Sequence, residues 1–367
     1  MVAFKNKLQL LRGLTQGEKA FTGPFFVDVD VTTRCNMHCL GCAFHSSKRR
    51  KNSAGESALE EIPLELVERL CKELPELGTH EVILAGEGEP FLHPRLFEII
   101  SAFKRAGCNV QLFTNGTLID EVNAPLILDS GLDVLNVSFW ANSPEEYEEC
   151  HPGVNPINFS KTLNRIKIVT ALKTQRKTAN PTVLLKQPFN RFNYRSIDAR
   201  IRLAQDTGCN GVKFDTYRHR EFTSAALSPQ EIRTLCEDLS KAKKRLEYLA
   251  LEHNIEEVLL KYRLGETAWH ELPCYIPWLY MRVGVDGTIW PCICSIPLGN
   301  LNEDSLQEIW NGPKYRSLRS TTLTTKGLAS LGGHCDCNWC CLANNNYKTH
   351  RFFKWVAPFV RKHRGKI

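Results

Sequence analysis

A regular alternation of strand and helix patterns between residues 25 and 215 constrains the fold most. Short apolar runs typical of buried strands are followed by longer amphipathic stretches bounded by Gly, Pro or Asn. The expected strands are residues 25–31, 81–85, 109–113, 134–139, 182–186 and 211–214, and the expected helices are residues 64–74, 96–106, 119–130, 159–173 and 197–207. Such alternation predicts parallel βα units. Six units cannot close an eight-stranded barrel, so we expect an α/β fold with an open partial (β/α)6 TIM-type barrel.

Three cysteines follow the first expected strand with the spacing C-x3-C-x2-C: Cys35, Cys39 and Cys42. Three thiolates on one loop can ligate three irons of a four-iron cluster and leave the fourth iron open. Free cysteines often act as small buried apolar side chains. A polar loop packs poorly, however, which argues against that role for these three cysteines. In a parallel α/β fold this loop lies at the carboxyl ends of the strands, where reactive sites gather.

The cysteine count also bears on the compartment. The chain has 15 cysteines among 367 residues, an odd number that does not suit a disulfide framework. No apolar run is long enough for a membrane span, and the amino-terminal stretch with Lys5 and Lys7 lacks the apolar region of a signal peptide. We therefore expect a cytoplasmic protein with reduced thiols. Five scattered cysteines are assigned no role: Cys71, Cys108, Cys150, Cys209 and Cys236.

Polar loops also follow the next three expected strands. Gly88, Glu89 and Pro90 come after the second strand, where glycine lets the backbone approach a ligand and the acid can take a positive amino group. Asn115 follows the third strand and Ser138 ends the fourth. Each also fits an ordinary turn or cap. The flat ring of Trp140 can wall a substrate at the mouth of the barrel. The polar residues at strand ends that can reach a ligand are Lys186, Gln187 and the run 215–218.

Together these loops resemble the radical S-adenosylmethionine (SAM) superfamily. The resemblance implies that Cys35, Cys39 and Cys42 bind a [4Fe-4S] cluster whose free iron chelates SAM, and that reductive cleavage releases a 5′-deoxyadenosyl radical. Residues 87–90 resemble the Gly-Gly-Glu-Pro motif with Glu87 in place of the first glycine, and Asn115 and Ser138 match positions lining the SAM pocket. Gly41 departs from the family, which commonly has an aromatic residue there, so the adenine contact is expected from Phe44 or backbone groups.

A second cysteine-rich region lies near the carboxyl end. Cys274 and Cys292 flank an expected β-hairpin, with strands at 280–285 and 288–290 around an Asp-Gly turn, and Cys337 and Cys340 form a C-x2-C pair. On spacing alone a four-cysteine zinc ribbon is a rival. The region resembles the SPASM and twitch auxiliary-cluster domains, which implies one auxiliary [4Fe-4S] cluster on Cys274, Cys292, Cys337 and Cys340. Three thiols remain: Cys294, Cys335 and Cys341. We expect them to be substitute ligands, hydrogen-atom donors or idle groups.

The expected domain organisation has five parts. They are a lead-in with a short helix (1–24), the barrel (25–225), a helical linker (226–272), the auxiliary domain (273–346) and a basic aromatic tail (347–367). The net charge of +7 is modest, but residues 48–51 and 351–366 are rich in Lys and Arg. The tail interleaves aromatic and basic residues, which suits either packing on the barrel or an anionic membrane surface. Pro358 is expected to break or bend a helix there.

The resemblance implies an oxidoreductase that takes a hydrogen atom from its substrate and passes the leftover electron to the auxiliary cluster. We expect a small-molecule, sugar or lipid-linked substrate, and a reductant such as flavodoxin or ferredoxin. The alternatives are a peptide-modifying maturase or epimerase of the same superfamily, and a zinc-stabilised nucleic-acid-binding protein that uses the basic runs. The sequence assigns no catalytic residue.

Overall fold

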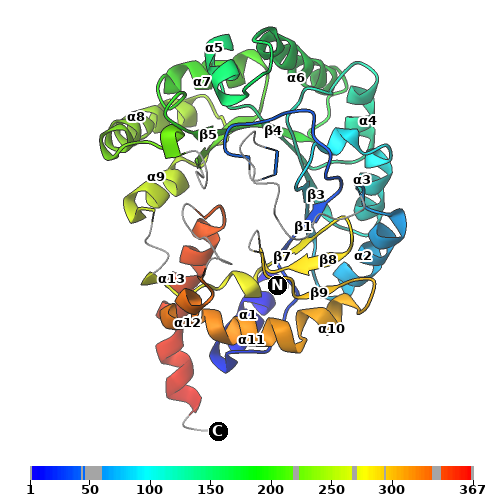
Figure 1. The fold of residues 1–367 in the computed structure, drawn as a ribbon, viewed down its shortest axis with the longest axis vertical. Coiled ribbons are helices and arrows are strands. Elements are labelled where there is room, and N and C mark those ends of the chain that lie inside the picture. Colours follow the sequence, from blue (N-terminus) through cyan, green and yellow to red (C-terminus); the bar gives the residue numbers. More distant parts are fainter. Residues whose placement is uncertain are drawn as a thin grey trace.

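The computed structural model describes residues 2–42, 44–45, 60–217, 223–266, 271–292, 295–332 and 340–364. Six parallel strands form a curved sheet in chain order, and helices cover its outer face without closing it into a full barrel (Figure 1). The strands are β1 (Phe26–Asp30), β2 (Glu81–Ala85), β3 (Asn109–Thr114), β4 (Val134–Ser138), β5 (Thr182–Phe189) and β6 (Gly211–Thr216). The helices that connect them are α2 (Leu64–Glu76), α3 (Leu96–Arg105), α4 (Asn123–Asp129), α6 (Ile157–Gln175) and α7 (Ile197–Asp206). The expected α/β open partial barrel is confirmed.

Strand alternation separates the core from the barrel interior. In β1, Val27 and Val29 are fully buried in the core beside Leu70 of α2. Because successive side chains of a strand point to opposite faces, Asp28 and Asp30 face the barrel interior. The sheet therefore presents apolar side chains to the helices and polar ones inward.

Two helical predictions differ from the structure. The short helix α5 (Pro144–Cys150) was not expected, although Ser143 caps it and Pro144 occupies its first turn. The stretch expected as one helical linker forms two helices, α8 (Pro229–Tyr248) and α9 (Ile255–Leu264). Between them Glu252 makes a parallel bridge beside Gly211. A Cβ at Gly211 would lie 2.2 Å from the Glu252 carbonyl oxygen, so this tertiary contact needs glycine.

The carboxyl-terminal hairpin extends the same sheet. Strands β7 (Tyr280–Val283) and β8 (Thr288–Trp290) pair antiparallel as predicted, and Gly287 adopts φ +80° at the turn. The sequence did not predict that β7 also pairs parallel with β1, Asp28 beside Arg282. The two-residue strand β9 (Gly299–Asn300) completes a nine-stranded sheet. The remaining helical segments here are η4 (Ile276–Trp278), α10 (Leu306–Trp310), α11 (Pro313–Thr322) and α12 (Thr325–Ser330).

The chain begins with α1 (Val2–Gln16) and ends with α13 (Ala343–Arg364), a long helix that extends away from the body (Figure 1). The expectation that Pro358 breaks this helix is wrong, because α13 continues through it. A proline in a helix removes one backbone hydrogen bond and its ring crowds the carbonyl four residues earlier, which lowers the stability of the helix without ending it here. Among the described residues, no helix has the length and apolarity needed to span a bilayer.

Candidate active site

The three-cysteine loop begins at the carboxyl end of β1, and its thiols are half-buried and not disulfide-bonded. The N–H groups of Phe44 and His45 donate to Cys42 Sγ at 3.4 and 3.2 Å. Burial, and then the nearby thiols of Cys42 and Cys35, raise the pKa of Cys39 well above its ordinary value. The three sulfur atoms therefore lie within electrostatic reach of one another, in a place where thiolates need a compensating cation.

This donor set fits an iron–sulfur cluster, which takes thiolate ligands. Over the described residues, no three His, Cys, Asp or Glu side chains converge as ligands of one metal ion. In a four-iron cluster each thiolate binds a different iron, so the sulfur atoms need not converge on one point. N–H groups directed at a sulfur are also a way in which proteins tune such clusters.

The loop after β2 packs backbone against backbone on the segment preceding Cys35. Glu89 N–H donates to the Arg34 carbonyl oxygen at 2.8 Å. A Cβ at Gly88 would lie 2.2 Å from that same oxygen, so glycine is required for the close approach. Pro90 is buried at the start of η1 (Pro90–Leu92). The sequence motif thus supports the cysteine loop directly.

Glu89 is buried and accepts hydrogen bonds from its own chain. Its carboxylate receives Thr114 Oγ1 at 2.6 Å and the N–H groups of Asn115 and Phe91 at 2.7 and 3.2 Å. Burial raises the pKa of Glu89 to about 7, against these hydrogen bonds. The side chain therefore braces the loops after β2 and β3, and most of its acceptor capacity is used within the chain.

Asn115 and Ser138 also make contacts around the cysteine loop. Asn115 Nδ2 donates to Asn36 Oδ1 at 2.8 Å, and Asn36 Nδ2 donates to Thr117 Oγ1 at 2.8 Å. Ser138 Oγ accepts from Trp140 Nε1 at 2.9 Å. The sequence singled out Asn115, Ser138 and Trp140, but it gave no indication of Asn36 and Thr117, whose role depends on pairing between loops.

Tyr217 occupies the space beside Gly41. Gly41 has φ +75°, and a Cβ built there would lie 2.4 Å from the Tyr217 ring. Tyr217 is buried and packs with Leu40 and Ala225 in a small cluster apart from the main core, with Trp140 against it. An aromatic ring from the segment after β6 therefore fills the space beside position 41.

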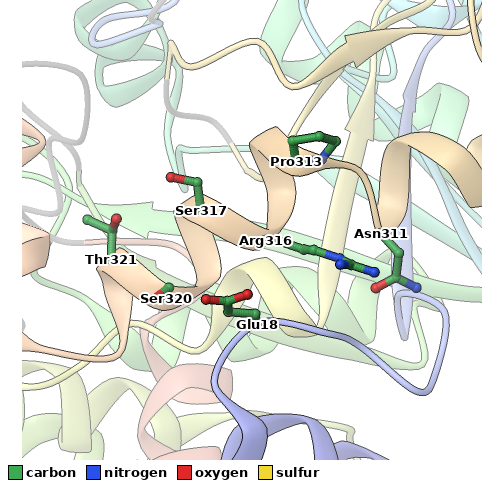
Figure 2. A pocket seen from close by; sticks show the side chains of 7 residues that line it. All are labelled: Glu18, Asn311, Pro313, Arg316, Ser317, Ser320 and Thr321. Carbon is green, nitrogen blue, oxygen red and sulfur yellow. The ribbon is translucent and has the colours of Figure 1, made fainter.

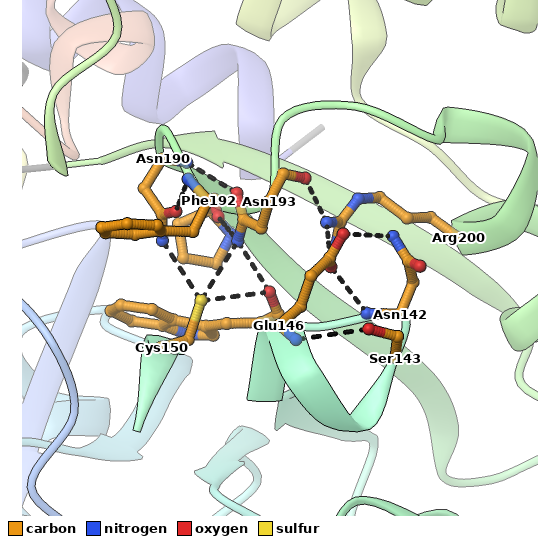
Figure 3. A network of polar contacts seen from close by, with 10 residues as sticks. Asn142, Ser143, Glu146, Cys150, Asn190, Phe192, Asn193 and Arg200 are labelled. Carbon is orange, nitrogen blue, oxygen red and sulfur yellow. Dashed lines mark hydrogen bonds and ion pairs between the residues drawn. The ribbon is translucent and has the colours of Figure 1, made fainter. Parts of the chain in front are cut away.

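A buried polar network joins α5, α7 and the segments that follow β4 and β5 (Figure 3). The Leu40 N–H donates to the Cys150 carbonyl oxygen at 2.9 Å, so the end of α5 holds the cysteine loop. Within α5, Glu146 pairs with the fully buried Arg200 of α7 at 3.0 Å and accepts two bonds from Asn142. Asn193 Nδ2 donates to the Trp140 carbonyl oxygen at 2.6 Å. This network was not expected from the sequence.

A charged cluster lines the barrel interior below the loop. Arg282 of β7 donates to both oxygens of Asp30 and to Glu87 at 2.8 Å. Burial lowers the pKa of Arg282, but these two carboxylates outweigh burial and raise the pKa above its ordinary value. Tyr280 donates to Asp28 Oδ2, whereas Asp28 Oδ1 is buried and receives no hydrogen bond from the described residues. In the sequence, the signal for this charged cluster was the pair of acidic residues at alternate positions of β1.

Two cationic groups lie within β5 and beside the end of β6. Lys186 and Gln187 were expected to end their strand, but β5 continues to Phe189. The Lys186 ammonium lies 5.3 Å from the centroid of the Phe113 ring, and burial lowers its pKa. Lys261 of α9 pairs with Asp215 at 2.5 Å. Gln187 is fully buried, and Arg218 is outside the described residues.

The auxiliary cysteines are described only in part. Cys274, Cys292 and Cys340 are half-buried and Cys341 is exposed. Cys294, Cys335 and Cys337 lie outside the described residues, as do residues 48–51. Burial, Asp28, Cys341 and Cys292 all raise the pKa of Tyr280, so both thiols lie within electrostatic reach of the β7 phenol.

A hollow of about 640 Å³ lies between α11 and the segment after α1 (Figure 2). The hollow is lined by Glu18, Asn311, Pro313, Arg316, Ser317, Ser320 and Thr321. None of these is a predicted site residue. It is separate from the cysteine loop in sequence, and we assign it no role.

Two family models match the chain. Residues 29–193 match the radical SAM superfamily and residues 274–346 match the SPASM iron–sulfur cluster-binding domain. These matches cover the cysteine loop, the loops after β2, β3 and β4, and the carboxyl-terminal cysteine region. Iron is thereby favoured over the zinc ribbon for the second region.

Curated relatives include enzymes with different substrates. A probable GTP 3′,8-cyclase of Methanothermobacter marburgensis is 34% identical over 120 residues, which is 32% of this chain and 36% of the relative. The aligned region thus spans about a third of the length of that relative. A PqqA peptide cyclase of Gluconobacter oxydans is 24% identical over 313 residues, covering 81% of this chain and 80% of the relative.

A solved structure shares the fold. Streptococcus suis SuiB bound to S-adenosylmethionine aligns with a TM-score of 0.63 at 15% identity, covering 88% of this chain and 76% of SuiB. At this identity the likeness supports the architecture alone.

Proposed function

Because the chain belongs to the radical SAM superfamily and carries a SPASM domain, we propose that it is an oxidoreductase that dehydrogenates a polar small-molecule, sugar or lipid-linked substrate. Its cofactors are a [4Fe-4S] cluster, SAM and an auxiliary iron–sulfur cluster. When bound, these groups supply a 5′-deoxyadenosyl radical that takes one hydrogen atom, and an acceptor for one electron, with flavodoxin or ferredoxin as the expected reductant. For a secondary alcohol, loss of the hydroxyl proton completes the conversion to a ketone.

The cysteine loop carries this proposal. We assign Cys35, Cys39 and Cys42 as the ligands of the SAM-binding cluster, because all three thiols sit on one loop that three separate parts of the chain brace. The braces are the Glu89 loop on Arg34, Asn115 on Asn36 and the Cys150 carbonyl on Leu40. Such bracing fixes the positions of the sulfur atoms before any cluster binds, which is how a metal site is preorganised. Tyr217 and Trp140 wall the same side of the loop, and we assign them to hold the shape of the SAM pocket together with Gly88, Pro90 and Ser138.

The barrel interior favours a polar substrate. Asp28, Asp30 and Arg282 lie on β1 and β7, whereas Lys186 and the Lys261–Asp215 pair lie on or beside β5 and β6, at the other end of the parallel strand order. A buried ionic group is costly unless it is paired. Side chains inside the barrel that can still form a hydrogen bond or ion pair therefore suit a ligand with hydroxyl or anionic groups. Asp28 is the group that we assign to accept the substrate proton, because its Oδ1 is unbonded and burial raises its pKa to about 7.

For the auxiliary cluster we assign Cys274, Cys292, Cys337 and Cys340 as ligands. The thiol of Cys292 lies within electrostatic reach of Tyr280, whose hydroxyl donates to Asp28, so Tyr280 would stand between an electron acceptor there and the proposed proton acceptor. Cys294, Cys335 and Cys341 remain candidates for substitute ligands or hydrogen-atom donors.

Peptide maturation is the second candidate. The PqqA peptide cyclase aligns over four fifths of both chains, a longer match than that of the GTP cyclases. A peptide would use the same cysteine loop, so the two candidates differ in substrate and not in the initial radical chemistry.

Deuterium transfer tests the proposal. The reconstituted enzyme is incubated anaerobically with SAM, reductant and either carbon-deuterated polyols and sugars or deuterated peptides, and 5′-deoxyadenosine is analysed by mass spectrometry. Deuterium from a polyol or sugar together with a carbonyl product supports the oxidoreductase. Deuterium from a peptide alone transfers the assignment to the maturase. In Cys292→Ala we expect deuterated 5′-deoxyadenosine to form while the carbonyl product is lost.

A further inference from the structure

The last helix presents two different faces. On one face, Asn346 accepts from the Tyr275 N–H at 2.6 Å, His350 contacts the Tyr275 hydroxyl at 3.0 Å, and the Phe353 ring lies 6.0 Å from the Tyr275 ring. These positions recur with helical spacing, so this face anchors α13 to the body. The prediction that the tail aromatics pack back on the protein therefore holds for Phe353.

The opposite face forms a groove with α9. We call it the α13 groove, and it has a volume of about 700 Å³ and largely apolar walls. Its lining consists of apolar and aromatic residues with three cations among them: Leu260, Tyr347, Lys348, Arg351, Phe352, Lys354 and Trp355. Trp355 is 73% exposed, which is unusual for an indole ring in water.

The charge of α13 indicates what kind of partner can cover the groove. The helix contains no Asp or Glu, and it carries Lys348, Arg351, Lys354, Arg361, Lys362 and Arg364. Glu257 of α9 neutralises Lys348 at 2.6 Å, whereas Arg351 and Lys354 stay exposed beside the indole. A partner that covers this groove must therefore present negative charge and apolar surface together.

We propose that the α13 groove binds the anionic surface of a phospholipid membrane. Phosphate groups meet Arg351 and Lys354 while Trp355 and Phe352 enter the interfacial region, a combination typical of peripheral helices. The anchored face keeps the barrel attached at a fixed position beside the bilayer. This inference is independent of the radical chemistry, because the groove shares no residue with the cysteine loop.

Vesicle sedimentation of the full chain tests the proposal. We expect binding to vesicles that contain phosphatidylglycerol and little binding to phosphatidylcholine alone. Arg351→Gln and Lys354→Gln should each lower the partition coefficient about fivefold, and Trp355→Ala should lower it several-fold. The matched controls are Tyr248→Ala and Lys241→Gln on α8, which remove an equally exposed aromatic and cation and should change nothing.

Three results would overturn the inference. The first is wild-type sedimentation that is absent or equal with neutral and anionic vesicles. The second is equal loss in the α13 variants and the α8 controls. The third is a concentration-dependent dimer, seen by light scattering and abolished by Trp355→Ala, which would assign the groove to a second copy. Circular dichroism of each variant establishes that α13 is retained.

Discussion

The backbone N–H of Leu40 donates to the carbonyl oxygen of Cys150 at 2.9 Å, so the cysteine loop is attached to the last residue of α5. The position of α5 depends in turn on the pair between Glu146 and the fully buried Arg200. A salt bridge remote from the thiols is thus linked to their geometry through one short helix.

Breaking that pair should affect both stability and cluster loading. Arg200→Met leaves Glu146 partly buried without its partner, which should lower the free energy of unfolding by about 3–5 kcal/mol. The matched control Arg176→Met breaks the exposed pair with Asp129 and should cost about 0–1 kcal/mol. Urea unfolding and iron content after reconstitution measure the two effects. Equal stability of the two variants would show that the network does not support α5.

The contact between Gly41 and Tyr217 predicts a steric effect separable from backbone strain. Gly41→Ala adds a left-handed non-glycine residue, costing about 1–2 kcal/mol, and also places Cβ 2.4 Å from the Tyr217 ring. Gly153 has a similar φ of +81° with nothing within 4 Å, so Gly153→Ala carries the strain alone. We expect SAM affinity, measured by equilibrium dialysis, to fall only in Gly41→Ala. Equal affinities in both variants would remove Tyr217 from the account of the pocket.

The pKa of Asp28 predicts a pH dependence of stability. Burial raises this pKa to about 7 from an ordinary 3.8, so between these values the folded state binds more protons than the unfolded state. The free energy of unfolding should therefore fall as pH rises through this window. Asp28→Asn removes the effect, and its stability relative to wild type should increase by about 3 kcal/mol between pH 5 and pH 8.

Glu98→Gln is the control for that series. Glu98 is exposed, and its hydrogen bond with Arg95 lowers its pKa, so it stays ionised throughout the range. Urea unfolding at both pH values provides the comparison. A stability difference between wild type and Asp28→Asn that is the same at pH 5 and pH 8 would contradict the raised pKa.

The sequence predicted elements whose signals are local. The six strands follow from apolar runs, and β2 spans the residues expected. The hairpin at Gly287 follows from its Asp-Gly turn. The carboxyl-terminal region was expected as a separate small domain, and its parallel pairing through β7 with β1 depends on two segments about 250 residues apart. No local pattern encodes that pairing.

The candidate site shows the same division. Cys35 and Glu89 were visible as motifs, because their spacing and order are local. The partners that position them, such as Arg200 and Tyr217, come from distant loops and resemble ordinary surface or core residues in the sequence. Glu252, which divides the expected linker helix, acts through a tertiary contact with Gly211 that only glycine permits.

The most direct test of the account is reductive SAM cleavage by the anaerobically reconstituted protein. Wild type and Cys71→Ala, which removes a thiol outside the motif, should both form 5′-deoxyadenosine under strong reduction. The triple variant Cys35→Ala, Cys39→Ala and Cys42→Ala should form none while it retains roughly four irons per chain on the auxiliary cysteines. Formation of 5′-deoxyadenosine by the triple variant, or its absence in iron-loaded wild type, would contradict the assignment of the cysteine loop.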